Sequence, residues 1–449
     1  MAESITLPIH FVGEDRLESA ELTAGQIGWA KANGFTGQRG RLLPLPDQNG
    51  NLSGYLFGTG TDANRPVFVA GLAGAALGEG QYRLAGDFGD ATRAATAFRL
   101  GAYRFDQFRQ ARTAPELELP SDADAAEVGR QVAAATLARD LINTPPNELG
   151  PDALDRTIRA FAAERGMSVT AIVGEELVAQ NFPLIHAVGR ASAEAPRLLD
   201  LSWGNPDHPK VTLVGKGVTF DTGGLDIKTA AGMLLMKKDM GGAANVLGLA
   251  HTIMDARLPV RLRVLIPIVE NAISGSSFRP GDIIRSRAGI TVEIGNTDAE
   301  GRLILADALA LADSEKPDLL LDMATLTGAA RAALGPDLPP LYSTDENLAR
   351  DLVASGLDWE DPLWPMPLWS PYDSMLASKV ADTNNAGSGG FAGSVTAALF
   401  LRKFVREARN WVHLDIYGWA PEARPGRPVG GTDQAIRAVY GVLRQRYGC

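Results

Sequence analysis

Two short segments of this chain carry acids and basic residues next to apolar runs. In the octapeptide NTDAEGRL (296–303), carboxylates and a guanidinium alternate: Asp298, Glu300 and Arg302. The glycine-rich segment 214–240 adds further charged groups: Lys216, Asp221, Lys228 and Asp239. Two divalent cations held close together need bridging carboxylates, because a shared anion offsets their repulsion and leaves positions for water and substrate. Asp221 and Glu300 suit that bridging role.

Other motifs built on similar residues fit the sequence less well. Lys216 is followed by Gly217 rather than by the Ser or Thr of a phosphate-binding loop, and Phe220 stands where a dinucleotide-binding motif has its third glycine. By itself NTDAEGRL could be an ordinary helix start with acids at its N-terminus. The five histidines show no HExxH spacing, and AGSGG (386–390) lacks the first glycine of a GxSxG nucleophile elbow. We therefore expect His413 to be structural and do not expect a serine hydrolase.

Composition narrows the range of functions. The chain has 449 residues, a formal net charge of −10 and one cysteine, Cys449. The acidic balance argues against nucleic acid as a partner, since phosphate backbones require clustered Lys and Arg. A single cysteine allows no intrachain disulfide. The N-terminus MAESITLPIHFV lacks a signal-peptide pattern and no long apolar run is present, so we expect a cytoplasmic protein without membrane contact.

The chemistry-bearing segments fall in a region of alternating apolar strands and helices. We expect strands at 211–214, 262–269, 291–294, 319–323 and 411–416, with helices at 241–255 and 303–312. Such strands predict a mixed, mostly parallel sheet flanked by helices, with ligands beyond the carboxyl ends of its strands. A helix at 122–142 precedes the Pro-rich 143–151. We therefore divide the chain into a small α/β N-terminal domain (1–120), a linking segment (121–146) and a larger catalytic domain (147–449).

These motifs resemble the M17 leucyl aminopeptidase family, whose signature is NTDAEGRL and whose metal loop resembles GKGVTFDTGG (215–224). The resemblance extends to NTPPNELGP (143–151), RPGD (279–282), DMATLTG (322–328) and WVHLDIYG (411–418). It implies a metal-dependent aminopeptidase that acts on peptide substrates, with two divalent ions per subunit, Zn or Mn. Members of the family form hexamers, so the resemblance also implies a homohexamer.

The resemblance also assigns roles to individual residues. It implies that Asp298, Asp221 and Glu300 hold one metal. The second metal would be held by Lys216, Asp221, Asp239 and Glu300. Lys216 would then be neutral, whereas Lys228 would stay protonated and stabilise the oxyanion of the tetrahedral intermediate. Arg302 would hold a bicarbonate that acts as general base.

Three further positions match the family's pocket for the substrate's first side chain: Met236, Thr325 and Gly328. For Met236, ordinary core packing is an equally good interpretation. An apolar pocket would favour leucine-like side chains without excluding others sharply. We expect the adjacent Lys237 and Lys238 to form a solvated pair at a helix start.

Two alternatives come from other functional classes. A binuclear phosphoesterase also needs clustered acids and two metals, but such sites usually recruit histidines and this cluster has none. Some bacterial relatives double as DNA-binding or regulatory proteins, so a hexameric DNA-binding role is the second alternative. The acidic balance argues against it as the main function.

Overall fold

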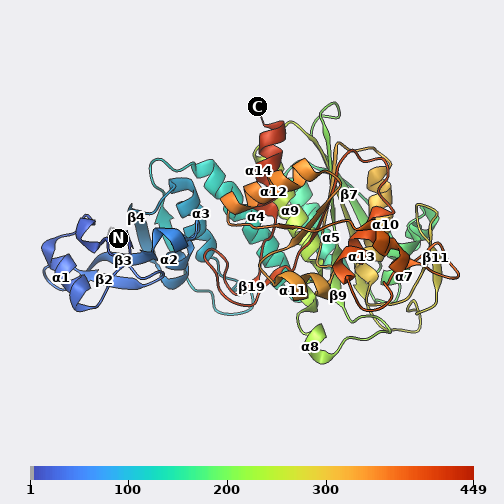
Figure 1. Cartoon of the computed structure of the whole chain (residues 1–449), viewed down its shortest axis with the longest axis horizontal. Coiled ribbons are helices and arrows are strands. Elements are labelled where there is room, and N and C mark those ends of the chain that lie inside the picture. Colours follow the sequence, from blue (N-terminus) through green and yellow to red (C-terminus); the bar gives the residue numbers. More distant parts are fainter. Residues whose placement is uncertain (1–4, 449) are drawn as a thin grey trace. The chain divides into compact units, whose positions relative to one another are not determined.

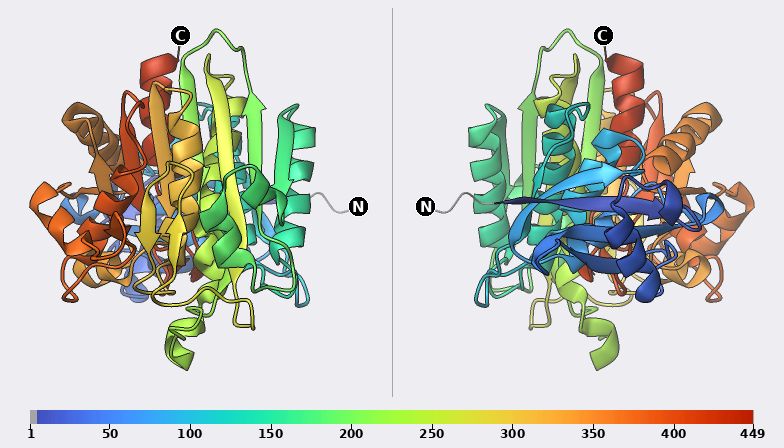
Figure 2. Two further views of the ribbon diagram at one scale, coloured as in Figure 1. Left: turned by 90° about the vertical axis from the view of Figure 1, so that its right-hand side faces the viewer. Right: turned by 90° about the vertical axis from the view of Figure 1, so that its left-hand side faces the viewer.

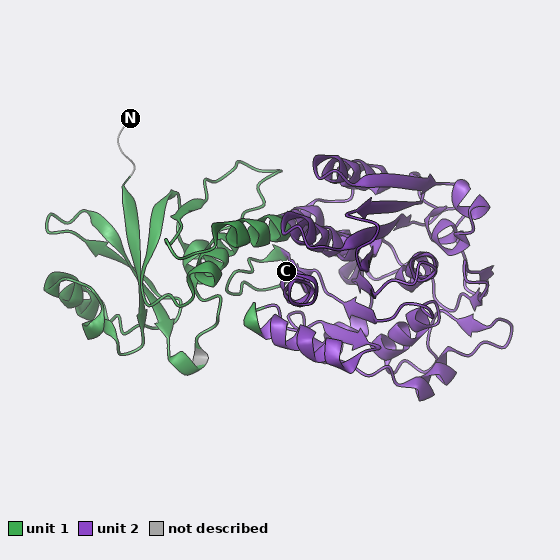
Figure 3. Cartoon of the chain, turned by 90° about the horizontal axis from the view of Figure 1, so that it is seen from above, with its two compact units in different colours: residues 1–136, 358–360, 420–430 green, residues 137–357, 361–419, 431–449 purple. Residues whose placement is uncertain are grey.

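The computed structural model describes residues 5–448, and within them the chain forms two compact units (Figure 3). Unit 1 comprises residues 1–136 together with two short stretches from much later in the chain, 358–360 and 420–430. Unit 2 comprises 137–357, 361–419 and 431–449. None of the described helices is both long and apolar enough to cross a membrane.

Unit 1 is built on a five-stranded sheet in the order β2-β3-β1-β4-β5. Its strands are β1 (Thr6–Gly13), β2 (Leu42–Pro46), β3 (Leu52–Gly60), β4 (Gly80–Gly86) and β5 (Pro115–Glu118). All neighbouring strands are parallel except β2 and β3. Its helices are α1 (Ala24–Ala32), α2 (Ala70–Ala76) and α3 (Ala91–Gly101). Aromatic side chains such as Phe11, Phe57 and Phe98 form a core between sheet and helices.

Unit 2 contains a nine-stranded mixed sheet, β15-β14-β17-β13-β8-β10-β7-β6, with β9 paired to β10 (Figures 1 and 2). Its strands are β6 (Ser168–Val173), β7 (Arg197–Trp203), β8 (Lys210–Gly215), β9 (Gly217–Asp221), β10 (Arg261–Asn271), β13 (Leu319–Ala324), β14 (Pro340–Ser343), β15 (Trp364–Pro365) and β17 (Trp411–Asp415). The centre, from β17 through β13 and β8 to β10, is parallel, whereas β14, β7 and β6 run antiparallel to their inner neighbours. The carboxyl ends of the central strands therefore meet at one edge.

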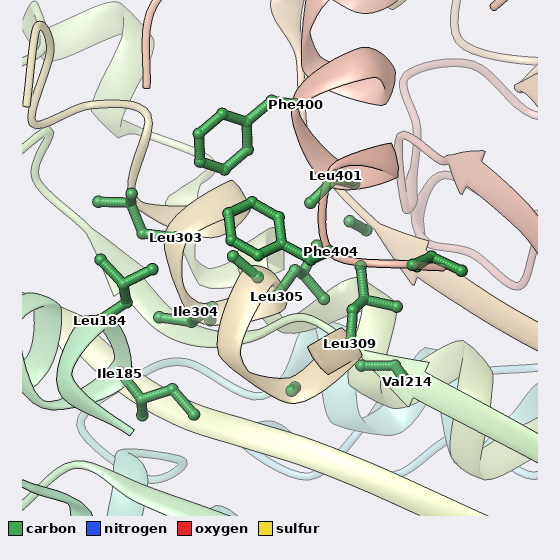
Figure 4. Close-up of a cluster of buried hydrophobic side chains, with 14 of the residues drawn as sticks. Leu184, Ile185, Val214, Leu303, Ile304, Leu305, Leu309, Phe400, Leu401 and Phe404 are labelled. Atoms are coloured by element: carbon green, nitrogen blue, oxygen red, sulfur yellow. The ribbon is translucent and has the colours of Figure 1, made fainter. Parts of the chain in front are cut away.

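Helices cover the sheet of unit 2 on both faces (Figure 2). The helices of this unit are α5 (Pro151–Glu164), α6 (Glu176–Ala179), α7 (Pro183–Gly189), α8 (Ala230–Met233), α9 (Gly241–Asp255), α10 (Glu300–Asp313), α11 (Gly328–Leu334), α12 (Glu346–Asp358), α13 (Gly393–Arg402) and α14 (Ile436–Tyr447). Helix α4 (Ala125–Asn143) begins among the residues of unit 1 and ends among those of unit 2. Helices α7, α10 and α13 share a buried apolar cluster with the sheet, in which Leu305 and Leu309 lie near Phe404 and Val214 (Figure 4). This packing fixes the start of α10, where the NTDAEGRL motif ends.

The predicted fold class, a mixed and mostly parallel sheet flanked by helices beside a smaller N-terminal α/β domain, is confirmed. The helix predicted at 241–255 coincides with α9, strands β8, β10 and β13 cover the predicted runs, and β17 ends one residue before the end of the run predicted at 411–416. The strand predicted at 291–294 exists as β12 (Thr291–Glu293), but its place in the main sheet was wrong. It pairs instead with β11 (Ile283–Arg285) and β16 (Thr383–Asn384) in a separate three-stranded sheet.

Candidate metal centre

The predicted site residues lie where the central strands of unit 2 end. Lys216 follows β8, Asp221 is the last residue of β9, and Thr325 follows β13. Asp239 lies in a 3₁₀ turn (Met236–Met240) directly before α9, and Glu300 is the first residue of α10. Since these strands are parallel, their polar ends converge at one edge of the sheet.

Two glycines let α9 approach this edge closely. A Cβ on Gly242 would lie 2.1 Å from the carbonyl oxygen of Met323, and a Cβ on Gly215 would lie 2.7 Å from the Cα of Ala243. No side chain larger than hydrogen fits at either position. The absence of a Cβ therefore brings the Asp239 turn against the end of β8, next to Lys216.

Lys216 is enclosed by carboxylates. Its Nζ donates to both oxygens of Asp239 at 2.9 and 2.8 Å and to the carbonyl oxygen of Thr325 at 3.1 Å, and it lies 3.0 Å from Oε1 of Glu300. Burial lowers the pKa of Lys216, but the surrounding carboxylates outweigh burial and raise it. A lysine must be neutral to coordinate a metal. Lys216 would become neutral only if additional positive charge in the cluster lowered its pKa.

Lys228 contacts the other carboxylates of the cluster. Its Nζ lies 2.8 Å from Oδ2 of Asp221 and also pairs with Oδ1 of Asp298. Partial burial lowers the pKa of Lys228, whereas Asp221 and Asp298 raise it more strongly, so the side chain is charged at neutral pH. The two lysines thus occupy opposite sides of one acidic cluster.

Asp221, Asp298 and Glu300 each offer a carboxylate oxygen within 4.8 Å of the others. Oδ1 of Asp298 and Oε1 of Glu300 are buried without an aligned hydrogen-bond donor among the described residues, and their only polar contacts are the two lysine ammonium groups. Burial, reinforced by neighbouring carboxylates, raises the pKa of Asp221 to about 6 and that of Glu300 to about 8. Closely spaced, under-satisfied oxygen ligands of this kind fit divalent cations.

A layer of hydrogen bonds holds Asp221 in position. Its Oδ1 accepts from the side-chain amide of Asn271 and from the backbone N–H of Gly223, both at 2.8 Å. Asn271 also donates to the carbonyl oxygen of Thr297 at 3.1 Å, which ties the end of β10 to the NTDAEGRL segment. Such outer partners fix the orientation of a ligand.

Arg302 reaches the same pocket from the first turn of α10. One terminal nitrogen donates to the carbonyl oxygen of Asn385 at 2.6 Å, while the buried Nε has no acceptor among the described residues. Burial lowers the pKa of Arg302 to about 10, so it remains charged at neutral pH. A buried guanidinium with a free donor is suited to bind an anion.

One pocket of about 560 Å³ brings together every predicted site residue. Around the acidic cluster, its wall includes Met236, Thr325 and Gly328, the positions predicted to contact the substrate's first side chain. The wall also includes residues that sequence reasoning missed: Lys238, Arg331 and Phe391. Phe391 is a large apolar side chain that is 81% exposed. It follows a loop with no catalytic motif, so the sequence contains no signal for it.

The expectation that Lys237 and Lys238 form a solvated pair was wrong for Lys238, which is buried and lines the pocket. Lys237 is half-buried, and its Nζ donates to the carbonyl oxygen of Asn143 at 2.7 Å. Burial lowers the pKa of Lys238 to about 8. The sequence did contain a signal for this burial, because Lys238 lies between two predicted site residues, Met236 and Asp239.

The strand of the WVHLDIYG motif, β17, pairs with β13, the strand that ends next to the pocket. His413 is fully buried, and its Nδ1 lies 2.6 Å from Oδ1 of Asp322, whose other oxygen accepts from the indole N–H of Trp411 at 2.9 Å. His413 therefore links two neighbouring strands, β13 and β17, in agreement with the expected structural role.

Comparisons with known proteins agree with this arrangement. Residues 136–440 match the profile described as the cytosol aminopeptidase family, catalytic domain, and residues 7–120 match the M17 aminopeptidase N-terminal domain. A probable cytosol aminopeptidase of Syntrophotalea carbinolica is 42% identical over 365 residues, which cover 77% of this chain and 73% of the relative.

Solved structures are similar over nearly the whole chain. The cytosol aminopeptidase of Coxiella burnetii superposes with a TM-score of 0.93 at 45% identity, covering 100% of this chain and 98% of that one. The bottromycin maturation enzyme BotP in complex with Mn superposes with a TM-score of 0.89 at 33% identity, covering 98% and 99%.

Proposed function

Because the chain belongs to the cytosol aminopeptidase (M17) family of peptidases, we propose that its pocket removes N-terminal residues from peptides with two divalent cations bound in the acidic cluster. Aminopeptidase activity follows from the family. The observation that carries the metal proposal is the group formed by Asp221, Asp298 and Glu300, whose carboxylate oxygens lie within 4.8 Å of one another.

We assign the ligands as two overlapping sets. Asp298, Asp221 and Glu300 would hold one cation, and Lys216, Asp221, Asp239 and Glu300 the other. Bound there, the cations would polarise the scissile carbonyl and lower the pKa of a water molecule. The short distance between the carboxylate oxygens of Asp221 and Glu300, within 4.8 Å of one another, supports their sharing between the two sets.

Two cationic side chains have separate tasks in this proposal. Lys228 is charged and lines the pocket, so it donates a hydrogen bond to the oxyanion that develops on the substrate carbonyl. Arg302 holds an anion, which we propose is bicarbonate acting as general base. The unpaired Nε of Arg302 supports that assignment.

We propose that the same pocket restricts cleavage to the first residue of a peptide. We propose that the free α-amine of the substrate occupies a ligand position, so that an acylated amine cannot bind productively. Met236, Thr325 and Gly328 would contact the first side chain, and the sulfur and methyl groups of Met236 and Thr325 favour leucine-like residues. All of these groups belong to the proposed catalytic domain, 147–449.

Metal identity, assembly and location are further parts of the proposal. Mn or Zn is proposed, and the similarity to BotP, whose solved complex contains Mn, supports Mn. A homohexamer is proposed from the family resemblance. A cytoplasmic location is proposed from the names of the relatives, which are cytosol aminopeptidases.

Purified protein should be assayed with leucyl, alanyl and glutamyl chromogenic amides, after chelation and after Mn or Zn is added back separately. We expect chelation to abolish hydrolysis and at least one metal to restore it. Acetylation of the leucyl substrate should prevent turnover. Hydrolysis that survives exhaustive chelation, or ready cleavage of the acetylated substrate, would contradict the proposal.

A further inference from the structure

Two positively charged side chains of the pocket wall lie beside the same aromatic ring. The Nζ of Lys238 lies 4.8 Å from the ring centroid of Tyr417, and the Cζ of Arg331 lies 4.5 Å from the same centroid. Lys238 is only 4% exposed, whereas Arg331 is exposed, and both line the pocket. Within residues 5–448, neither the ammonium of Lys238 nor the guanidinium of Arg331 has a hydrogen bond or an ion pair.

The carboxylates that act on Lys238 from nearby belong to Asp239 and Asp415. Both are already engaged with other groups. Asp239 accepts from Lys216 at 2.8 and 2.9 Å and from the hydroxyl of Thr325 at 2.9 Å. Asp415 accepts the backbone N–H groups of Leu326 and Thr327 at 2.9 and 3.1 Å, and its other oxygen accepts the hydroxyl of Thr327 at 2.6 Å. The part of the chain that the structure describes therefore supplies no carboxylate that pairs with Lys238.

A buried ammonium without an anionic partner loses its hydration without recovering that loss in a contact. The ring of Tyr417 compensates only in part, because a cation–π contact is weaker than a charge-assisted hydrogen bond to a carboxylate. The side on which Lys238 and Arg331 can still accept a partner is the substrate pocket. A carboxylate entering there would meet two positively charged side chains that pair with no carboxylate of the described residues.

We propose that Lys238 and Arg331 recognise an acidic side chain on the substrate's N-terminal residue, so that glutamate is preferred to its neutral isostere glutamine. The inference rests on the proposed aminopeptidase function. Lys238 lies two residues after Met236, and Arg331 lies in α11, which begins at Gly328. Both cations thus adjoin the positions proposed to contact the first side chain, and they extend an otherwise leucine-like pocket toward carboxylates.

The test compares kcat/KM for glutamyl and glutaminyl chromogenic amides, with the leucyl amide as reference, in protein loaded with one metal. We expect the wild type to favour glutamyl over glutaminyl by about tenfold or more, the usual effect of a charged hydrogen bond. The ratio should fall toward one in Lys238→Met, which keeps the length of the side chain but removes its charge. Arg331→Gln, at an exposed position, should lower the same ratio.

The neighbouring lysine provides a matched control. Lys237→Met should retain the wild-type ratio, because the Lys237 ammonium donates to Asn143 and is not part of the pocket wall. Equal rates for glutamyl and glutaminyl amides in the wild type, or an unchanged ratio in both Lys238→Met and Arg331→Gln, would overturn the inference.

A binding measurement separates this inference from the proposed function. If the wild type hydrolyses no amide, the proposed function fails, and titration calorimetry with free glutamate and glutamine still decides the role of the two cations. Tighter binding of glutamate that is lost in Lys238→Met supports the inference, and equal binding of the two amino acids overturns it.

Discussion

We propose opposite tasks for two residues of the same type in this site because their surroundings differ. Lys216 is buried against Asp239 and Glu300, so its nitrogen occupies the interior of the cluster. Lys228 is less buried and pairs with Asp221 and Asp298 at the pocket wall. Position in the cluster, rather than spacing in the glycine-rich segment, distinguishes a proposed ligand from a proposed oxyanion donor.

Removing each lysine should therefore change a different quantity. Lys228→Ala should retain both metals and lower kcat on the order of 100- to 1000-fold, the usual loss for one oxyanion donor. Lys216→Ala should weaken binding of one metal, and excess metal should partly restore its activity. Metal titration and steady-state kinetics on both variants measure the two effects. A near-normal kcat in Lys228→Ala together with intact metal binding in Lys216→Ala would refute both assignments.

The first turn of helix α10 contributes residues to the site, and the middle of the helix contacts other segments of the fold. Gly301 lies beside Lys216 so closely that a Cβ there would approach the Cε of Lys216 to 2.4 Å. Further along the helix, Asp307 is fully buried and binds two other segments. The element therefore connects the metal cluster with the packing of α7.

The variant Gly301→Ala should move Lys216 without unfolding the protein, because the side chain that it meets is flexible at its end. We expect metal affinity to fall by about tenfold or more, following a typical loss for a disturbed ligand environment, and the free energy of unfolding to change little. The matched control is Gly129→Ala in α4, where a Cβ would meet no atom within 4 Å. This control should be neutral or stabilising by about 0.5–1 kcal/mol. Unchanged metal affinity in Gly301→Ala would show that Lys216 is not needed where it lies.

Asp307 should make stability depend on pH. Its carboxylate accepts the N–H groups of Leu184 and Arg287, both at 2.8 Å, yet burial raises its pKa to about 7 despite these bonds. A carboxyl whose pKa is higher in the folded than in the unfolded protein stabilises the fold fully below the unfolded pKa of about 4. That contribution is lost as pH rises through about 7.

The measurement compares urea unfolding of the wild type and Asp307→Asn at a series of pH values and one metal concentration. The stability of the wild type relative to Asp307→Asn should decline between about pH 4 and 7 and level off above, since the Asn side chain does not titrate. A difference that is constant over this range would mean that Asp307 keeps an ordinary pKa in the folded protein.

Elements defined by a long apolar pattern were predictable, and features defined by surroundings were not. Helix α9 was predicted at its observed bounds because a pattern of helical periodicity over fifteen residues fits a helix and not a strand. The short run at β12 was identified as a strand, but an apolar run does not specify its hydrogen-bonding partner, and the strand joined another sheet. Lys238 was expected in solvent because the sequence shows that the side chain is charged but does not show that it lies over the ring of Tyr417. Arg331 and Phe391 belong to no motif, so only the folded chain brings them to the pocket.

At the scale of the molecule, the proposed metal centre joins segments that are distant in the sequence. Its groups come from the ends of β8 and β9, from the turn before α9 and from the start of α10. Cations that bind these groups only when they are assembled must stabilise the folded unit. Metal occupancy and global stability are therefore linked.

Chelation should lower the unfolding temperature of the wild type, since a ligand at about a hundredfold excess over its Kd contributes about 2.7 kcal/mol. Glu300→Ala and Asp221→Ala, which each remove a proposed bridging ligand, should lose both metals and nearly all activity. Their unfolding temperatures should consequently be insensitive to chelation. Differential scanning calorimetry with metal analysis provides the measurement. Two tightly held ions in either variant would contradict the bridging assignment.

The composition of unit 1 bears on the order of events during synthesis. Its five-stranded sheet is complete once residue 118 has been made, but the unit also contains 358–360 and 420–430. The late stretch is an integral part: a Cβ on Gly71 would lie 2.2 Å from the backbone nitrogen of Gly426. Domains usually fold from the N-terminus as the ribosome releases them. Here the unit that contains residue 118 is completed only when residues 420–430 have been made, so the nascent chain carries this unit without its last stretch through most of its translation.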